Sequence, residues 1–284
     1  MPARSKWSQF AIVLGRALLV SSFVEDAVRH GWEWSEDLNW VHARLHIGDK
    51  YLPWFACAVL LALEIGLQLA GSLLVVANLR VTEASTVLLA FNTLRPLWQV
   101  TPHRWIERCA AFLAGFVLVV AQAAQDRANT RSEADAALGG LLTRSLAGEG
   151  QKTLARCLIC IMSCLHFMHP DMIGNMLFTL LVMMCLCGAI ILGVAVKPCA
   201  LTLAVLLFSV APEIFPYWDD FAKIDYHRSS AAEGTVARLK MKYVNSQFQF
   251  YQTLTSAGSM LLLSQFGSDV TFLTSLKEDD EKSL

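Results

Sequence analysis

The sequence predicts an all-α membrane protein, a polytopic helical bundle of about eight transmembrane helices in two parallel four-helix repeats. Of its 284 residues, 55% are hydrophobic and only 17% are charged, and the mean hydropathy is +0.46. Soluble domains carry about a quarter charged residues, so this composition indicates a membrane protein. The 23 Lys and Arg residues nearly balance 24 Asp and Glu residues. No basic excess therefore argues for nucleic acid as a partner.

The predicted spans are apolar segments close to the length of about 20 residues that a helix needs to cross a bilayer. We place them at Trp7–Val28, Leu52–Leu79, Glu83–Trp98, Glu107–Gln125, Thr153–Met168, Met172–Val196, Pro198–Phe215 and Gln247–Phe266. The third and the fifth are short. Arg16 interrupts the first apolar run and no cleavage site follows it, so we expect an uncleaved first helix rather than a signal peptide.

A weak internal repeat suggests the division into two halves. The segment LAGSLLVVANLR, which ends at Arg80, resembles LCGAIILGVAVK, which ends at Lys197, and this alignment pairs Gly71 with Gly188. An even number of spans per half predicts parallel repeats. The proposed first repeat covers 1–125 and contains an inserted connector at 27–50. A polar loop at 126–152 follows it. The second repeat covers 153–266 and contains an inserted loop at 216–246, and a polar cytosolic tail covers 267–284.

Each of the two insertions follows an odd-numbered span, so we expect both on one face of the membrane. They are rich in aromatic and acidic residues, which suggests a binding surface. The first begins within FVEDAVRHGWEWSE, from Phe23 to Glu36. Its tryptophans are also typical of an aromatic belt at the headgroup level. A belt does not account for the nearby charges, among which Glu25 and Arg29 have the i, i+4 spacing that pairs charges on a helix.

Ionisable residues within predicted spans are the next candidates, because a charge in the membrane is costly unless it is paired or hydrated. Arg16 and Glu64 are such residues, and Gln68 lies one helical turn from Glu64. We favour an intramembrane pair between Arg16 and Glu64 that fixes helix packing. The alternative is a polar site for a substrate or a proton.

Three cysteines in RCLICIMSC, Cys157, Cys160 and Cys164, share one helical face. Buried cysteine usually packs as a small hydrophobe, and metal sites need a polar second shell that this segment lacks. We therefore expect packing here, with no metal and no cofactor, and keep redox chemistry as an alternative.

The run R-x-x-L-x-x-x-F-x-E-D-x-x-R, from Arg16 to Arg29, followed by WEWSE, resembles the first span of the surfeit locus protein four family of endoplasmic reticulum cargo receptors. Leu165-His166-Phe167 and the segment FYQTLTSAGSMLLL from Phe250 also resemble that family. The similarity is collinear over most of the chain. The two-halved organisation is similar to the four-helix DoxX-like membrane proteins.

The resemblance implies a receptor that binds soluble secretory proteins in the endoplasmic reticulum lumen and carries them into vesicles bound for the Golgi. It implies both termini in the cytosol, contacts with vesicle coat components on that side, and membrane lipid around the spans. Cargo would contact a luminal site, for which we name Glu25, Asp26, Arg29, Trp34 and Glu36. In the sorting tail KEDDEKSL, Lys277 and Lys282 are present, but Glu281 stands where a dilysine retrieval signal has its second lysine.

We expect no enzymatic activity, because no nucleophile with a base and an orienting partner can be assembled from the sequence. Two alternatives to a receptor remain open. One is a small-molecule transporter that uses Arg16, Glu64 and Gln68. The other is a membrane redox protein that uses Cys157, Cys160 and Cys164.

Overall fold

The computed structural model describes helices, one short ribbon and the turns between them; the described residues are 6–47, 50–94, 113, 115–117, 119, 153–154, 156–161, 163–164, 177–227 and 233–266. The helices are α1 (Lys6–Leu19), α2 (Ser21–Trp32), α3 (Trp34–Arg44), α4 (Trp54–Val76), α5 (Val81–Leu94), α9 (Leu177–Ile191), α10 (Val196–Ile214), α11 (Tyr217–His227) and α12 (Glu233–Phe266). Strands β1 (His46–Ile47) and β2 (Lys50–Tyr51) form an antiparallel ribbon. The prediction of an all-α bundle is thus confirmed, with this ribbon as a small addition.

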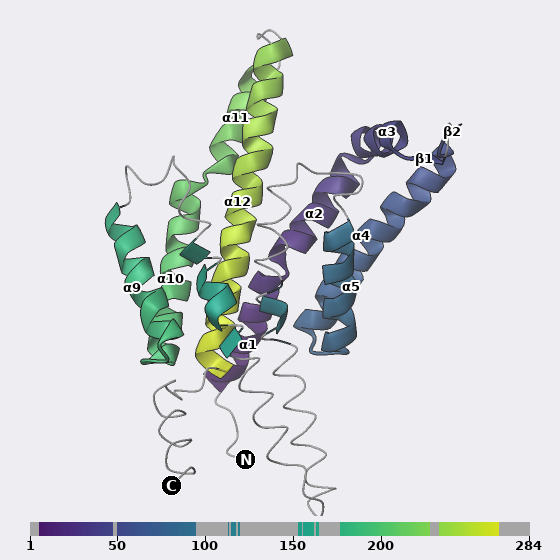
Figure 1. Ribbon diagram of the computed structural model, residues 1–284. Helices are drawn as coiled ribbons and strands as arrows, with labels where there is room; N and C mark the ends of the chain where they lie inside the picture. The colour runs from purple at the N-terminus through teal and green to yellow at the C-terminus, as the bar shows by residue number, and fades with distance from the viewer. Residues whose placement is uncertain are drawn as a thin grey trace, which may run out of the picture.

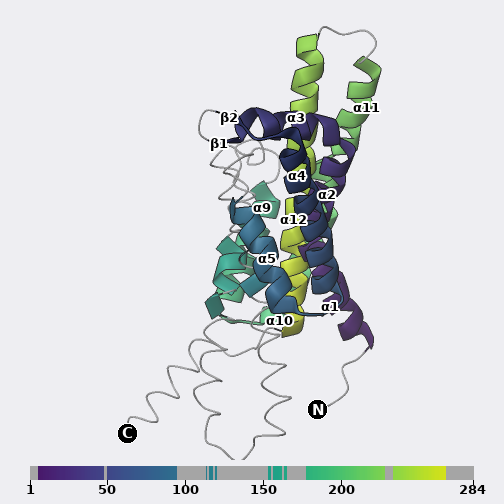
Figure 2. The same cartoon turned by 90° about the vertical axis from the view of Figure 1, so that its right-hand side faces the viewer.

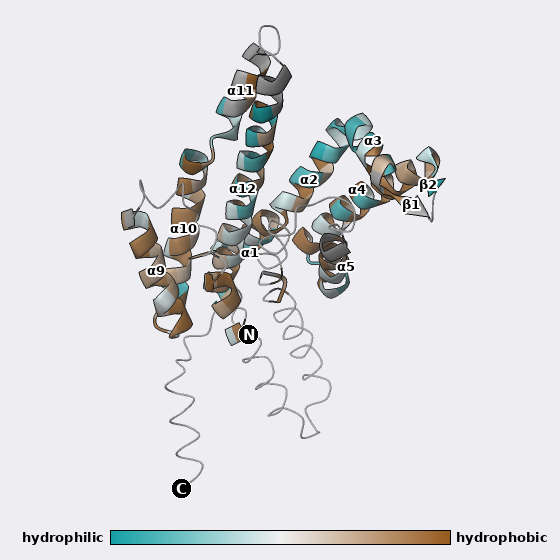
Figure 3. Cartoon of the chain, turned by 45° about the horizontal axis from the view of Figure 1, so that its top comes forward, coloured by the Kyte–Doolittle hydropathy of each residue, from teal (hydrophilic) through white to brown (hydrophobic). Residues whose placement is uncertain are grey.

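Within the described part of the chain, two helical stretches are long and apolar enough to cross a membrane, Trp54–Val76 and Val196–Asp219. Two shorter apolar helices occur at Val81–Phe91 and Phe178–Ile191. The expected total of eight spans is therefore not confirmed. The segment expected at 107–125 lies largely outside the described residues, and the one expected at 153–168 is described, as helix, only at 153–154, 156–161 and 163–164. Hydrophobic residues dominate α9, α10 and the lower part of α12, whereas hydrophilic residues gather in α2, α3 and the upper part of α12 (Figure 3).

The first expected span is not one helix. It breaks at Val20 into α1 and α2, next to a pair of serines. The Ser21 hydroxyl donates a hydrogen bond to the carbonyl of Leu18 at 2.7 Å, and Ser22 is hydrogen-bonded to Thr255 of α12 at 3.1 Å. Serine pairs are a known cause of helix kinks because their hydroxyls compete for backbone carbonyls. The break separates an apolar helix from a charged one.

Helix α12 is the centre of the bundle and packs against α1, α10 and α11 (Figures 1 and 2). Its crossing with α1 depends on two glycines. A Cβ atom on Gly258 would lie 2.6 Å from the carbonyl oxygen of Gly15 and 2.6 Å from the backbone nitrogen of Leu19. Small residues allow such close helix approach in membranes. The last helix thus packs directly on the first, so the predicted halves share a core rather than forming separate bundles.

The inserted loop expected at 216–246 is mostly helical. Helix α11 covers Tyr217–His227, and α12 begins at Glu233, well before the apolar segment expected from Gln247. The stretch VARLKMK from Val236 contains mostly strong helix formers. Hydropathy marks where a helix enters the membrane, whereas propensity decides where the helix begins, and here the two differ.

Two hairpin turns have the same backbone conformation. One joins α4 to α5 and has positive φ at Asn78 (59°) and Arg80 (45°); the other joins α9 to α10 and has positive φ at Gly193 (77°) and Ala195 (46°). Both close through an equivalent hydrogen bond, from the Leu79 N–H to the Leu74 carbonyl (2.9 Å) and from the Val194 N–H to the Ala189 carbonyl (2.8 Å).

The turns correct the register of the sequence alignment in this hairpin. They pair Arg80 with Ala195, whereas the alignment pairs Arg80 with Lys197. Apolar segments match one another at several offsets, so hydropathy alone does not distinguish these registers. The division into two four-helix repeats remains a prediction.

Candidate functional site

The two insertions meet at one end of the bundle, where α2 and α3 approach the upper part of α12 (Figure 1). The contact is electrostatic. The Lys240 ammonium on α12 lies 2.5 Å from a carboxylate oxygen of Glu36 and 3.4 Å from one of Glu33. We call the residues that meet here the charged junction: Glu25, Asp26, Arg29, Glu33, Glu36 and Lys240.

Arg29 organises the inner part of the charged junction. Its guanidinium lies 3.4 Å from Glu25 and 3.0 Å from Asp26, at the i, i+4 and i, i+3 spacings of a helix, and 3.9 Å from Glu33. Glu25 and Asp26 are buried, at 8% and 1% exposure. A buried carboxylate needs a paired charge, and Arg29 supplies it. These two carboxylates therefore support the junction from inside rather than forming its outer surface.

The corner between α2 and α3 is held by a second pair. The Nδ1 atom of His30 lies 2.5 Å from a carboxylate oxygen of Asp37, and the His30 side chain is almost completely buried. This contact fixes the direction in which α3 leaves α2. It thereby places Glu36, one residue before Asp37, beside Lys240.

The charges of the junction shift the pKa of Lys240 within it and of Tyr243 beside it. The hydrogen bond to Glu36 raises the pKa of Lys240 above its usual value; partial burial opposes this, and the charge of Glu33 adds to it. Burial raises the pKa of Tyr243, and the charges of Tyr217, Glu25 and Glu33 add to that shift. The carboxylates of the junction therefore disfavour ionisation of Tyr243.

An aromatic cluster adjoins the charged junction on α11 and α12. Ring centroids of Tyr217 and Phe250 lie 5.3 Å apart, those of Trp218 and Phe250 lie 6.0 Å apart, and those of Phe221 and Tyr243 lie 5.8 Å apart. These mostly tilted or edge-on arrangements are the ones that aromatic rings favour. Trp218 and Phe221 are 43% and 59% exposed. The end of the bundle thus combines exposed aromatic rings with paired charges.

The expected site residues have different positions in this end of the molecule. Glu25, Asp26 and Arg29 form its buried layer, and Glu36 is its exposed member with a side chain 67% exposed. Trp34 begins α3 and is partly buried, whereas its neighbour Trp32 is 89% exposed. As an exposed apolar platform, Trp32 fits better than Trp34.

Sequence reasoning missed the contribution of Lys240, Glu33 and the His30–Asp37 pair. Glu33 had a detectable signal, since it lies four residues after Arg29, the spacing of a helical ion pair. Lys240 had none, because it lies 204 positions from Glu36 and only the fold brings the two together.

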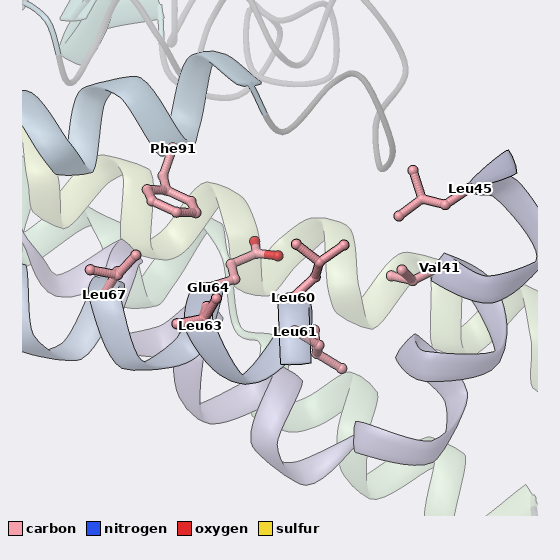
Figure 4. A pocket seen from close by; sticks show the side chains of 8 residues that line it. All are labelled: Val41, Leu45, Leu60, Leu61, Leu63, Glu64, Leu67 and Phe91. Atoms are coloured by element: carbon pink, nitrogen blue, oxygen red, sulfur yellow. The ribbon is translucent and has the colours of Figure 1, made fainter. Parts of the chain in front are cut away.

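The intramembrane candidates Arg16 and Glu64 are both buried, at 4% exposure each, on helices α1 and α4 that contact each other. Their direct pairing remains a prediction. The structure places Glu64 in the lining of a pocket between α3, α4 and α5, and the other lining side chains are apolar (Figure 4). Gln68 is buried beside it at 3% exposure but is not among the residues that line the pocket.

Other polar groups are buried in the same hairpin. Within the part of the chain that the structure describes, Gln68 Oε1, Ser72 Oγ and Ser85 Oγ have no hydrogen-bond partner. Gln68 and Ser72 continue the α4 face of Glu64 at four-residue intervals, and Ser85 lies on α5. Unpaired buried polar groups are costly, so packing alone does not explain why the α4–α5 hairpin buries these three side chains.

The structure adds a cysteine that the sequence did not indicate. Cys160, Cys164 and Cys187 of α9 pack in one hydrophobic core, with the thiol of Cys187 beside the other two. Cys157 is partly buried, and the described cysteines are free. Among the described residues, no group of three or more His, Cys, Asp or Glu side chains is arranged to hold a metal ion. The tail residues Lys277 and Lys282 lie outside the described residues.

Comparison with known proteins agrees with the resemblance found in the sequence. A sequence model of the SURF4 family matches residues 5–279. A Caenorhabditis elegans protein, uncharacterized protein T02E1.7, is 25% identical over 265 residues, which cover 89% of this chain and 85% of the relative. No solved structure matches the chain. The relation to DoxX-like proteins remains a prediction. The family match spans nearly the whole sequence and the helices carry the apolar character of membrane segments, so this chain is a membrane protein that belongs to the SURF4 family.

Proposed function

We propose that this chain is a non-enzymatic receptor that binds soluble secretory proteins in the lumen of the endoplasmic reticulum and carries them into vesicles bound for the Golgi. It then cycles back, with coat components contacting its cytosolic side. The proposal starts from the family resemblance. The observation that supports it most strongly is the bridge from Lys240 to Glu33 and Glu36, because this bridge joins the two insertions into one surface.

The composition of this surface suits protein recognition. Binding energy in protein interfaces is concentrated in a few aromatic and charged residues, each contributing about 2 kcal/mol or more. The exposed residues here are of those kinds: Trp218, Phe221 and Glu36. The buried ion pairs of Arg29 keep α2 rigid beneath them. A preformed surface loses less entropy when it binds a partner.

The charge of the surface indicates the chemistry of the cargo segment. The junction contains four carboxylates but only two cations, Arg29 and Lys240, so the balance is negative. A cargo segment with an amine or a basic side chain would complement it, and an adjacent apolar residue would contact the aromatic cluster. Trp34 and Glu25, which we named from the sequence, would act through the α2–α3 corner rather than at the centre of the contact.

Site-specific photocrosslinking in intact cells tests the proposal. A photoreactive amino acid at position 36 should capture soluble secretory proteins. The same amino acid at Leu73, which is 67% exposed near the opposite end of α4, should capture none because that position faces lipid. Capture of the same soluble proteins from both positions, or of none from position 36, would contradict the proposal.

Export of a captured protein gives the functional readout. Glu36→Lys and Trp218→Ala should each weaken capture by tens of fold, because about 2 kcal/mol corresponds to that factor. The matched control is Arg238→Glu, since Arg238 is exposed on α12 and points about 200° away from Lys240 around the helix. Normal export by correctly located Glu36→Lys and Trp218→Ala receptors would rule out this surface.

A further inference from the structure

The segment that joins α3 to α4 carries a group of exposed aromatic side chains. Tyr51 ends the β-ribbon, and Trp54 and Phe55 begin α4. Their exposures are 58%, 48% and 80%, and Lys50 beside them is also exposed. These four residues lie outside the charged junction, so the proposed cargo surface does not account for them.

Helix α4 fixes the depth of this group in the bilayer. It has 23 residues, about 34 Å at 1.5 Å per residue, which matches the roughly 30 Å of a hydrocarbon core. The exposed cations Lys50 and Arg80 flank its two ends. Phe55, Val59 and Leu63 form one exposed stripe at four-residue intervals, with exposures of 80%, 40% and 52%. Such a stripe on a spanning helix faces lipid, and Phe55 is its first residue.

The order of the side chains matches the layers of a membrane surface. Lys50 comes first, Tyr51 and Trp54 follow, and Phe55 begins the apolar run. A lysine at this level places its ammonium among the lipid headgroups. Tyrosine and tryptophan rings occupy the headgroup level, because they combine an apolar body with a polar tip. A surface for a soluble protein would not require this change of polarity with depth.

His42 connects α3 to the same group. Its ring stacks on that of Trp54, with centroids 4.3 Å apart and 14° between the planes, and its centroid lies 5.5 Å from that of Tyr51. Helix α3 lies crosswise to α12, at the upper end of α4 (Figures 1 and 2). The stack therefore holds α3 at the level of Trp54, along the membrane surface rather than across it.

We propose that Lys50, Tyr51, Trp54 and Phe55 form a contact surface for the headgroup layer of the bilayer, and that the His42 stack holds α3 along this layer. The charged junction is then set at the membrane surface. Helix α12 has 34 residues, about 51 Å, and exceeds the roughly 30 Å of the hydrocarbon core. Its polar upper part extends beyond the headgroups. This contact does not require the receptor function.

Depth-dependent fluorescence quenching tests the contact on the purified full-length chain in lipid nanodiscs. A genetically encoded fluorescent amino acid replaces Phe55, and phosphatidylcholine carries a nitroxide either near the headgroup or at the end of an acyl chain. We expect the shallow nitroxide to quench at least twofold more than the deep one. The matched control is the same amino acid at Phe221, which is 59% exposed on α11. Aqueous iodide should quench at position 221 at least threefold more than at position 55.

Two results would overturn the proposal. Strong iodide quenching at position 55 without quenching by either lipid would show that the surface faces water and is open to a soluble protein. Stronger quenching by the deep nitroxide would place Phe55 inside the hydrocarbon core, which would remove the headgroup contact.

Two His42 variants test the stack separately. The fluorescent amino acid is placed at Ser35, which is exposed and lies seven residues before His42, on the same side of α3. His42→Ala should lower quenching by the shallow nitroxide at position 35 at least twofold, whereas His42→Phe keeps a flat ring and should restore it. Equal quenching in folded His42→Ala would show that the stack does not hold α3 at the membrane. Gel filtration checks folding, and the result at position 55 stays decisive if a variant does not fold.

Discussion

The hairpins α4–α5 and α9–α10 have the same turn conformation but differ in the polarity of their buried residues. When they are aligned by their turns, buried positions coincide. Val75 matches Ile190, both 0% exposed, and Leu88 matches Leu203, at 1% and 0%. The shared turn and the shared burial indicate one structural frame used twice, as two repeats would require.

The difference lies in three buried positions of that frame. The first hairpin has Gln68, Ser72 and Ser85, and the second has Met183, Cys187 and Ala200; all six are at most 3% exposed. The second hairpin packs α10 against α12, and its apolar residues suit that structural role. The first hairpin instead contains the Glu64 pocket. The two hairpins therefore share backbone conformation and buried positions, while a few buried polar residues distinguish the α4–α5 hairpin from the α9–α10 hairpin.

The largest expected effect tests whether the two hairpins are structurally equivalent. Leu88→Ala and Leu203→Ala each remove a fully buried side chain, and such truncations cost about 2–5 kcal/mol because a cavity remains. If the two positions are equivalent, both variants should lower the thermal unfolding midpoint in detergent by similar amounts. Leu201→Ala is the control, since Leu201 is 46% exposed on α10. A large loss at one position with almost none at the other would show that the frames are not equivalent.

The next largest effect is expected when a polar side chain is placed in the apolar core of the α9–α10 hairpin. Met183→Gln gives α9 the residue that α4 has at the matching position, but an amide without a partner in an apolar core costs about 1–3 kcal/mol. We expect a lower unfolding midpoint without loss of helix content by circular dichroism. Met184→Gln is the matched control, because Met184 is 49% exposed. Equal midpoints for Met183→Gln and the unmodified protein would mean that α9 can satisfy a buried amide, so the hairpins would differ less than the structure indicates.

The reverse exchange should stabilise the protein. Gln68→Met removes a buried carbonyl oxygen that has no hydrogen-bond partner within the described residues and replaces it with a side chain of similar length. Replacing an unsatisfied polar group by an apolar one of the same shape is neutral or favourable, here by about 1 kcal/mol. We expect a higher unfolding midpoint. A lower midpoint would indicate that Gln68 has a structural partner, such as a bound water.

The hairpins also show what the sequence could and could not predict. The ends of α4 are close to the predicted span at 52–79 because a continuous apolar run marks them. The break at Val20 was missed since the apolar pattern continues through it, although Ser21 and Ser22 were a local signal. The start of α12 was missed because its first turns are helical but polar. Hydropathy thus located membrane segments better than helix ends.

Prediction of the site succeeded where the spacing is local and failed where it depends on the fold. The i, i+4 spacing of Glu25 and Arg29 predicts the ion pair that the structure shows. The partnership of Glu36 with Lys240 depends on the α2–α3 corner and on the early start of α12. The grouping of Cys187 with Cys160 and Cys164 likewise depends on helix packing. Local patterns carry no information on such contacts.

The smallest expected effect concerns the turn that defines the comparison. Gly193 adopts φ of 77° and its counterpart Asn78 adopts 59°, and both lie in the left-handed region, where a side chain is unfavourable for most residues. Gly193→Ala should cost about 1 kcal/mol, because alanine introduces a Cβ atom there. Asn78→Gly should change stability by only a few tenths of a kcal/mol, because asparagine tolerates this conformation better than most residues. Both are measured as shifts of the unfolding midpoint. If Gly193→Ala and Asn78→Gly were equally neutral, the second turn would not have the left-handed conformation, and the register that pairs Gln68 with Met183 would have to be redrawn.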